Sequence, residues 1–207
     1  MRSLPVLGTK IPRRFGRPTA MFGRAFLGGL GWGIEGEMPN LSKAVLILAP
    51  HTSAWDFFVT LATIFALRLR IGFLAKKSLF RGPLGRLLRW LGGIPVDRSA
   101  KHNFVARAVD RFQASDKLLL GILPEGTRGK VKRWKTGFYY IALGAGVPVV
   151  PVSLDFSRKV LSFGPPLDLT GDRVADFMEL GTHFEGVEGR NPEELDAVRN
   201  RIRNRID

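Results

Sequence analysis

The chain has 207 residues, of which 45% are hydrophobic, so it can form one domain with a packed core and is not a disordered tail. It contains no cysteine, which excludes disulfides, thiolate metal ligands and a cysteine nucleophile. Its 32 Lys and Arg against 18 Asp and Glu give a net charge of +14, which indicates an anionic partner: nucleic acid, an anionic membrane or a phosphorylated substrate.

Residues 1–37 form a basic and apolar segment that lacks the apolar run of a signal peptide. Its most apolar stretch, residues 20–34, is shorter than the ~20 residues of a membrane span and contains Arg24. This stretch could lie in a membrane interface or form a short helix packed on the domain's own core. We therefore divide the chain into the segment 1–37 and a domain at 38–207.

Beyond this segment, apolar strands alternate with amphipathic helices. Strands are predicted at 44–49, 71–75, 94–96, 118–123, 147–154 and 160–163. Helices are predicted at 54–69, 84–91, 104–112 and 136–143, and a last one begins at Asn191 and Pro192. Two prolines, Pro148 and Pro151, put the strand at 147–154 near a sheet edge or make it join late. The alternation predicts a single α/β domain with a mixed, mostly parallel central sheet flanked by helices.

Two polar loops follow predicted strands, at the ends where α/β sheets usually carry their functional residues. The first reads PHTSAWD, residues 50–56, and the second reads PEGTRGK, residues 124–130.

The first loop contains a histidine and an aspartate five residues apart, His51 and Asp56. On one helix these side chains would point ~140° apart, so they meet only if His51 precedes the helix and Asp56 lies in its first turn. Ser53 as N-cap, with Asp56 three residues later, resembles a capping box and gives this arrangement. A carboxylate on one imidazole nitrogen orients the ring as a base for a hydroxyl that attacks a carbonyl. The alternative is that Ser53 and Asp56 only cap the helix.

Ser53 offers a competing mechanism as a nucleophile. The sequence has no G-x-S-x-G motif, so we favour direct attack by the acceptor hydroxyl without a covalent enzyme intermediate. It also has no G-x-x-x-x-G-K-[ST] phosphate loop, which argues against nucleotide hydrolysis.

Basic residues stand near the ends of several predicted strands. In the second loop Gly126 permits a tight turn, and Thr127 and Arg128 can donate to a phosphate. Lys76 ends the strand at 71–75, and Arg98 follows the strand at 94–96. If these strand ends lie side by side, they form a cationic cup near the histidine.

Four sequence blocks, in this order, resemble the lysophospholipid acyltransferase family, the group of 1-acylglycerol-3-phosphate acyltransferases. They are H-x4-D at 51–56, AKKSLFRGPLGRLLRWLGGIPVDRS at 75–99, EGTR at 125–128 and VPVVPVS at 147–153. The resemblance implies the glycerolipid acyltransferase fold, with His51 as general base and Asp56 as its orienting carboxylate. It implies that Pro148 and Pro151 help to form the wall of the site. The residues that it implies for the acceptor's phosphate and its loop are Lys76, Arg98, Glu125, Gly126, Thr127 and Arg128.

The resemblance also implies the substrates. The donor is an acyl thioester, acyl-CoA or acyl carrier protein, and neither metal nor cofactor is needed. The acceptor is a lysophospholipid such as lysophosphatidic acid, and the protein acts peripherally on an anionic membrane, at the cytoplasmic face of the bacterial inner membrane. Two departures leave an aminolipid or glycolipid acceptor open: the N-terminal region has little room for a two-helix anchor, and Lys-Lys-Ser at 76–78 stands where an acid is common. A basic nucleic-acid-binding module would leave the four blocks unexplained, so no nucleic acid partner is expected.

Overall fold

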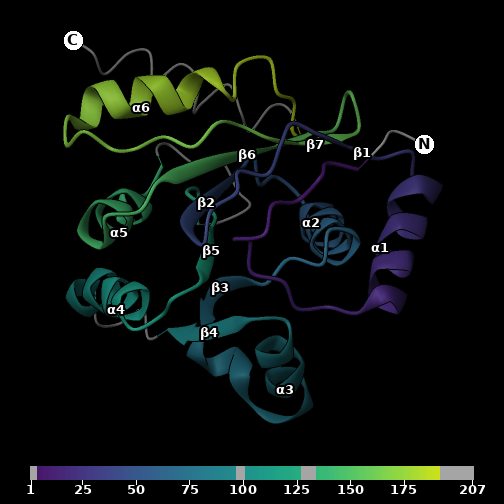
Figure 1. The fold of residues 1–207 in the computed structure, drawn as a ribbon, viewed down its shortest axis with the longest axis horizontal. Coiled ribbons are helices and arrows are strands. Elements are labelled where there is room, and N and C mark those ends of the chain that lie inside the picture. The colour runs from purple at the N-terminus through teal and green to yellow at the C-terminus, as the bar shows by residue number, and fades with distance from the viewer. Residues whose placement is uncertain (1–3, 97–100, 127–133, 192–207) are drawn as a thin grey trace.

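The computed structural model describes residues 4–96, 101–126 and 134–191. Within these ranges seven strands form one sheet in the order β1-β7-β6-β2-β5-β3-β4 (Figure 1). All neighbouring strands are parallel except β6 and β7, which are antiparallel. The predicted fold class, a mixed and mostly parallel sheet flanked by helices, is confirmed. The strands are β1 Gly33–Glu35, β2 Lys43–Ala49, β3 Ile71–Lys76, β4 Gly93–Val96, β5 Leu118–Ile122, β6 Val149–Asp155 and β7 Val160–Phe163.

Helices cover both faces of the sheet because the buried strand β2 is apolar on both sides. Its Leu46 packs in the cluster that holds Val59 of α2, and its Ile47 packs in the cluster that holds Phe112 of α4 and Ile141 of α5. Figure 1 shows α1 and α2 on one side of the sheet and α4 and α5 on the other. The helices are α1 Arg17–Gly29, α2 Trp55–Ala66, the 3-10 helix η1 Lys77–Phe80, α3 Gly82–Trp90, α4 Lys101–Gln113, α5 Gly137–Ala145 and α6 Arg173–Thr182.

The helix predicted at 54–69 ends three residues early, at Ala66. Arg68 has a φ of 57°, in the left-handed region, and the Leu69 N–H bonds to the carbonyl of Ile64 at 2.9 Å. This is the geometry of a helix C-terminus that glycine usually forms. An arginine at that position gave no sequence signal for the stop.

Of the two predictions for the proline-bearing strand, a position near a sheet edge is wrong, because β6 lies between β7 and β2. The strand does begin late, at Val149, after Pro148 and two residues beyond the predicted start. The Pro151 carbonyl accepts from Gly164 N–H at 2.9 Å, on the side away from β2. A residue's nitrogen and carbonyl face the same side of a strand. The missing N–H of Pro151 therefore costs no bond to β2.

The N-terminal segment packs against the domain. Gly23 of α1 faces the backbone of Ala62 and Ala66 so closely that a Cβ there would overlap it. The same helix leaves Met21 and Phe22 exposed, at 69% and 63%. Strand β1, which belongs to this segment, pairs with β7 in the sheet. The domain boundary at residue 37 stays a prediction. No helix in the described part of the chain is both long and apolar enough to cross a bilayer.

Helix α6 was not predicted from the acidic stretch in which it lies. Its N-cap is Asp172, whose carboxylate accepts from the N–H groups of Val174 at 3.0 Å and Ala175 at 3.2 Å. The helix predicted to begin at Asn191 falls largely on residues 192–207, outside the described ranges.

Asp176 fixes α6 to the domain and is only 1% exposed. Its carboxylate accepts from the Tyr139 hydroxyl at 2.9 Å, the Thr170 N–H at 3.0 Å and the Thr170 hydroxyl at 2.8 Å. Burial raises the pKa of Asp176, but these bonds and that of Gly171 lower it by more, so the net pKa is below its ordinary value.

Replacing Asp176 by alanine should lower the free energy of unfolding by about 3 kcal/mol, because buried donors lose their acceptor. For a domain of this size that is a fall in Tm of about 6–12 °C. In the wild type the folded pKa is the lower one, so this stabilisation is present above pH 3.8 and is lost as pH falls through the folded value. Thermal unfolding of both proteins at neutral and acid pH measures this. A variant as stable as the wild type at neutral pH would contradict it.

Candidate active site

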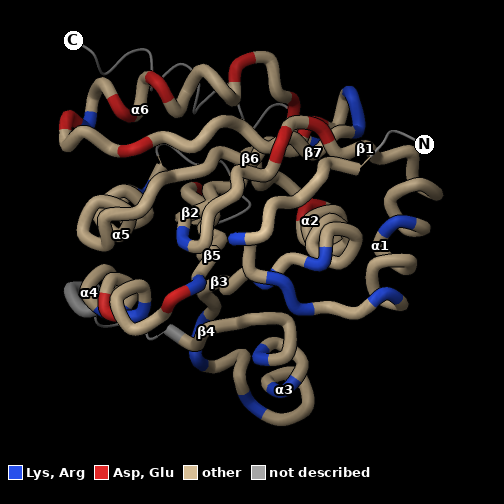
Figure 2. The backbone as a smooth tube through the Cα atoms, viewed as in Figure 1, with Lys and Arg blue, Asp and Glu red and all other residues tan. Residues whose placement is uncertain are grey.

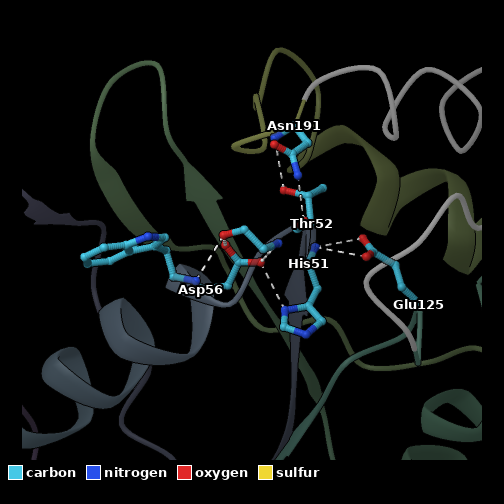
Figure 3. Close-up of polar contacts among 7 residues, drawn as sticks. His51, Thr52, Asp56, Glu125 and Asn191 are labelled. Atoms are coloured by element: carbon cyan, nitrogen blue, oxygen red, sulfur yellow. Dashed lines mark hydrogen bonds and ion pairs between the residues drawn. The ribbon is translucent and has the colours of Figure 1, made fainter.

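Strand β2 ends at Ala49, and the loop of residues 50–54 leads into α2. The loop places Nδ1 of His51 3.1 Å from Oδ2 of Asp56, which lies in the first turn of α2 (Figure 3). The two side chains meet as the sequence predicted. The Nδ1 atom is not aligned for a full hydrogen bond with any described residue, and such bonds in empty sites often tighten only when substrate binds. Figure 3 shows the other ring nitrogen turned away from the carboxylate.

The carboxylate of Asp56 is fully buried, and the start of its own helix holds it in place. Oδ2 accepts from the Ser53 N–H at 2.8 Å, and Oδ1 accepts from the Ser53 hydroxyl at 3.1 Å. Ser53 Oγ in turn accepts from the Trp55 N–H at 3.1 Å. The N-cap is Ala54 rather than the predicted Ser53. The carboxylate of Asp56 therefore holds Ser53 in the loop before α2 and contacts His51 at the same time, so the two interactions are not alternatives.

Glu125 holds the backbone of His51 from the neighbouring strand. Both of its carboxylate oxygens accept from the His51 N–H, at 3.0 and 3.1 Å, and the residue is 6% exposed. This contact arises because Glu125 follows β5, which pairs in parallel with β2. The sequence grouped Glu125 with the phosphate-binding residues. The structure shows this carboxylate bonded to the His51 backbone, and the assignment of Glu125 to the phosphate-binding loop stays a prediction.

A second clamp comes from the far end of the described chain and was missed in the sequence. The Asn191 amide donates to the Thr52 carbonyl at 3.1 Å, and its backbone N–H donates to the Thr52 hydroxyl at 3.4 Å (Figure 3). The guanidinium of Arg190 lies 5.2 Å from the centre of the Trp55 ring. Asn191 and Thr52 are 139 residues apart in the sequence, so no local sequence pattern could have predicted their contact.

The proposed phosphate-binding residues are described only in part. Lys76 is exposed at the end of β3. Gly126 has a φ of 69°, and a Cβ on it would lie 2.5 Å from Nζ of Lys135, so this lysine side chain lies over the turn. Three further predicted residues lie outside the described ranges: Arg98, Thr127 and Arg128. The cationic cup therefore stays a prediction.

The described residues contain no group of three or more His, Cys, Asp or Glu side chains that could hold a metal ion. That the reaction needs no metal or cofactor stays a prediction from the family resemblance. The wall formed by Pro148 and Pro151 also stays a prediction.

The chain is similar along most of its length to bacterial acyltransferases. It is 30% identical over 200 residues to the 1-acyl-sn-glycerol-3-phosphate acyltransferase of Salmonella typhimurium, covering 85% of this chain and 79% of that protein. It is 27% identical over 199 residues to the enzyme of the same name from Escherichia coli, with the same two coverages.

A solved structure shares the fold. The PlsC 1-acyl-sn-glycerophosphate acyltransferase of Thermotoga maritima superposes with a TM-score of 0.61 at 20% identity, covering 87% of this chain and 79% of that one. The profile of the family described as Acyltransferase matches residues 34–155, which span both the H-x4-D loop and the Glu125 loop. With a sheet whose strand ends bring His51, Asp56 and Glu125 together, the chain belongs to the acyltransferase family.

Proposed function

We propose that this protein transfers a fatty acyl group from an acyl thioester to the free hydroxyl of 1-acyl-sn-glycerol-3-phosphate. The observation that carries the proposal is the 3.1 Å contact between His51 Nδ1 and Asp56 Oδ2. The relatives named above support the acceptor, since their names specify 1-acyl-sn-glycerol-3-phosphate. The donor is acyl-CoA or acyl carrier protein, and the enzyme works peripherally on the cytoplasmic face of an anionic membrane.

The reaction needs a base for a hydroxyl that is a weak nucleophile at neutral pH. The Nε2 atom of His51 accepts the hydroxyl proton as the hydroxyl oxygen attacks the thioester carbonyl carbon. Asp56 stabilises the imidazolium that forms. The carbon–sulfur bond then breaks, and the departing thiolate takes the proton from Nε2 of His51. The products are a lipid ester and a free thiol, and the enzyme returns to its starting state.

The acceptor's phosphate needs cations beside this base. Lys76 stands at the end of β3, and Lys135 lies over Gly126 in the loop that also carries Glu125. We assign these two lysines, together with Arg98, Thr127 and Arg128, to the phosphate. Electrostatic attraction from several such groups favours a phosphate monoester over an uncharged lipid headgroup.

A panel assay tests the proposal. The purified protein is incubated with labelled acyl-CoA or acyl carrier protein and with lysophosphatidic acid, lysophosphatidylethanolamine, an ornithine lipid precursor or a glycolipid acceptor. We expect the highest kcat/KM with lysophosphatidic acid and inhibition of that reaction by inorganic phosphate. A preference for the aminolipid or glycolipid, without effect of phosphate, would assign a different acceptor to the same chemistry.

Asn191 should contribute to kcat through the loop it holds. Replacing Asn191 by alanine removes the bond to the Thr52 carbonyl and loosens the backbone next to His51. Since one such bond is worth about 1 kcal/mol, we expect kcat to fall about three- to tenfold while KM for acyl-CoA stays the same. Arg190→Ala, which removes only the contact with the Trp55 ring, is the control and should have a smaller effect. Equal kcat in wild type and Asn191→Ala would show that the clamp is not needed.

A further inference from the structure

The outward face of α3 is apolar, the reverse of what a helix on a soluble domain normally shows. Leu84, Leu87 and Trp90 are exposed at 52%, 49% and 46%. The inward contact is made instead by Gly85, which is buried so close to Phe80 that a Cβ there would overlap its backbone. The small residue lets the helix lie tightly on η1, and the large apolar residues are left for another surface.

The preceding turn extends this face, and one end of it is held rigidly. Leu79 of η1 is 46% exposed. The Trp90 ring packs edge-on against Phe15 at 5.4 Å and Phe65 at 6.2 Å between centres. A half-exposed tryptophan held in this way suits a boundary between apolar and aqueous phases. We call the surface of Leu79, Leu84, Leu87 and Trp90 the α3 face.

The charged residues of η1 and α3 have one sign. The sequence contains no Asp or Glu between Asp56 and Asp97. Lys77, Arg81 and Arg86 are exposed next to the face. In Figure 2 the only charged residues on α3 are basic, whereas α6 carries several acidic ones. An apolar centre with a basic surround is the pattern of helices that lie in the headgroup region of anionic membranes.

The α3 face follows directly in sequence after β3, whose carboxyl end lies at the edge of the sheet that carries the candidate site. Lys76 ends β3 and Lys77 begins η1. Strand β3 is parallel to β5, which is parallel to β2, so these strands end on the same side of the sheet as the His51 loop. A protein docked through η1 and α3 therefore has this end of the sheet near the lipid.

We propose that the α3 face docks the protein on an anionic lipid bilayer, with the leucines and Trp90 among the headgroups and Lys77, Arg81 and Arg86 on lipid phosphates. This surface is separate from α1. The docking itself stands on the α3 face alone, and only its use in delivering a lipid acceptor rests on the function proposed above.

Vesicle sedimentation tests this proposal with the full chain. The vesicles are phosphatidylglycerol mixed with phosphatidylcholine, or phosphatidylcholine alone. Replacing Leu84 and Leu87 together by serine should weaken binding to the anionic vesicles at least about tenfold, because two half-exposed leucines lose their apolar contact. Replacing Arg81 and Arg86 together by glutamine should weaken it by a similar factor and leave the weak binding to phosphatidylcholine unchanged.

The matched control is the pair Val174 and Met178 of α6, which are exposed at 51% and 49%. Serine at both positions should leave vesicle binding unchanged. Thermal unfolding and turnover of a short-chain acceptor dissolved as monomers should be unchanged in the α3 variants, which separates docking from folding and from the acyl transfer itself. Equal vesicle binding by the wild type and the Leu84/Leu87 variant would overturn the proposal. Binding of the wild type to single-stranded RNA in preference to the vesicles would also overturn it.

Discussion

Replacing His51 by alanine is expected to lower kcat for acyl transfer by about 10²–10⁴-fold, the usual contribution of a positioned general base. The acceptor hydroxyl then has only water to take its proton. Because Glu125 and Asn191 bond to the backbone of His51 and Thr52, removal of the ring should leave those bonds in place. Binding of acyl-CoA, measured by calorimetry, should therefore persist.

The assay is turnover of labelled acyl-CoA with lysophosphatidic acid by wild type and variant at matched concentrations. Thermal unfolding of the His51→Ala protein serves as the folding control. If the folded variant keeps kcat within about tenfold of the wild type, less than a general base supplies, His51 is not the base.

Replacing Asp56 by asparagine should reduce kcat by about 10³–10⁴-fold although the side chain keeps its shape. Oδ2 faces both the Ser53 N–H and Nδ1 of His51, so an amide nitrogen in that position loses the Ser53 bond and presents a donor to the ring. A donor next to Nδ1 favours the tautomer with its proton on Nε2, which leaves no lone pair there for the acceptor hydroxyl. The imidazolium formed in the reaction also loses its negative partner. Single-turnover kinetics of the wild type and the variant separate the acyl-transfer step from substrate binding.

Ser53→Ala is the matched control for Asp56→Asn. It removes one bond to Asp56 and one to the Trp55 N–H and leaves the contact between His51 and Asp56 intact. We expect a decrease of at most about tenfold, the value of one or two such bonds. A loss as large as that of His51→Ala would favour Ser53 as a covalent nucleophile instead.

Much of the fold could be predicted from the sequence because its signals are local. The apolar run of β2 and the leucine spacing of α3 both identify their elements directly. The misplaced strand β6 shows the limit: Pro151 lacks an N–H, but which side of the strand that nitrogen faces depends on neighbouring strands. Helix α6 was missed because its acidic composition outweighed a good N-cap, Asp172, and because its stability comes from the buried Asp176, a tertiary contact.

In the candidate site, too, contacts that are local in the sequence could be predicted and contacts between distant residues could not. The contact between His51 and Asp56 could be predicted because it lies within one loop and one helical turn, where chain geometry allows few arrangements. Glu125 was found through its motif, but its bond with the His51 N–H was not, since the parallel pairing of β2 and β5 decides which group its carboxylate meets. Asn191 was identified only as the start of a helix, and its contact with Thr52 gave no signal because the two residues are far apart in the sequence and near only in the fold.

The most direct test of the central claim is a crystal structure with lysophosphatidic acid and a thioether analogue of acyl-CoA bound together. The account predicts that the free hydroxyl oxygen lies about 2.6–3.2 Å from Nε2 of His51, in hydrogen-bond range. A hydroxyl bound out of reach of this nitrogen, with the imidazole directed at another group, would contradict it.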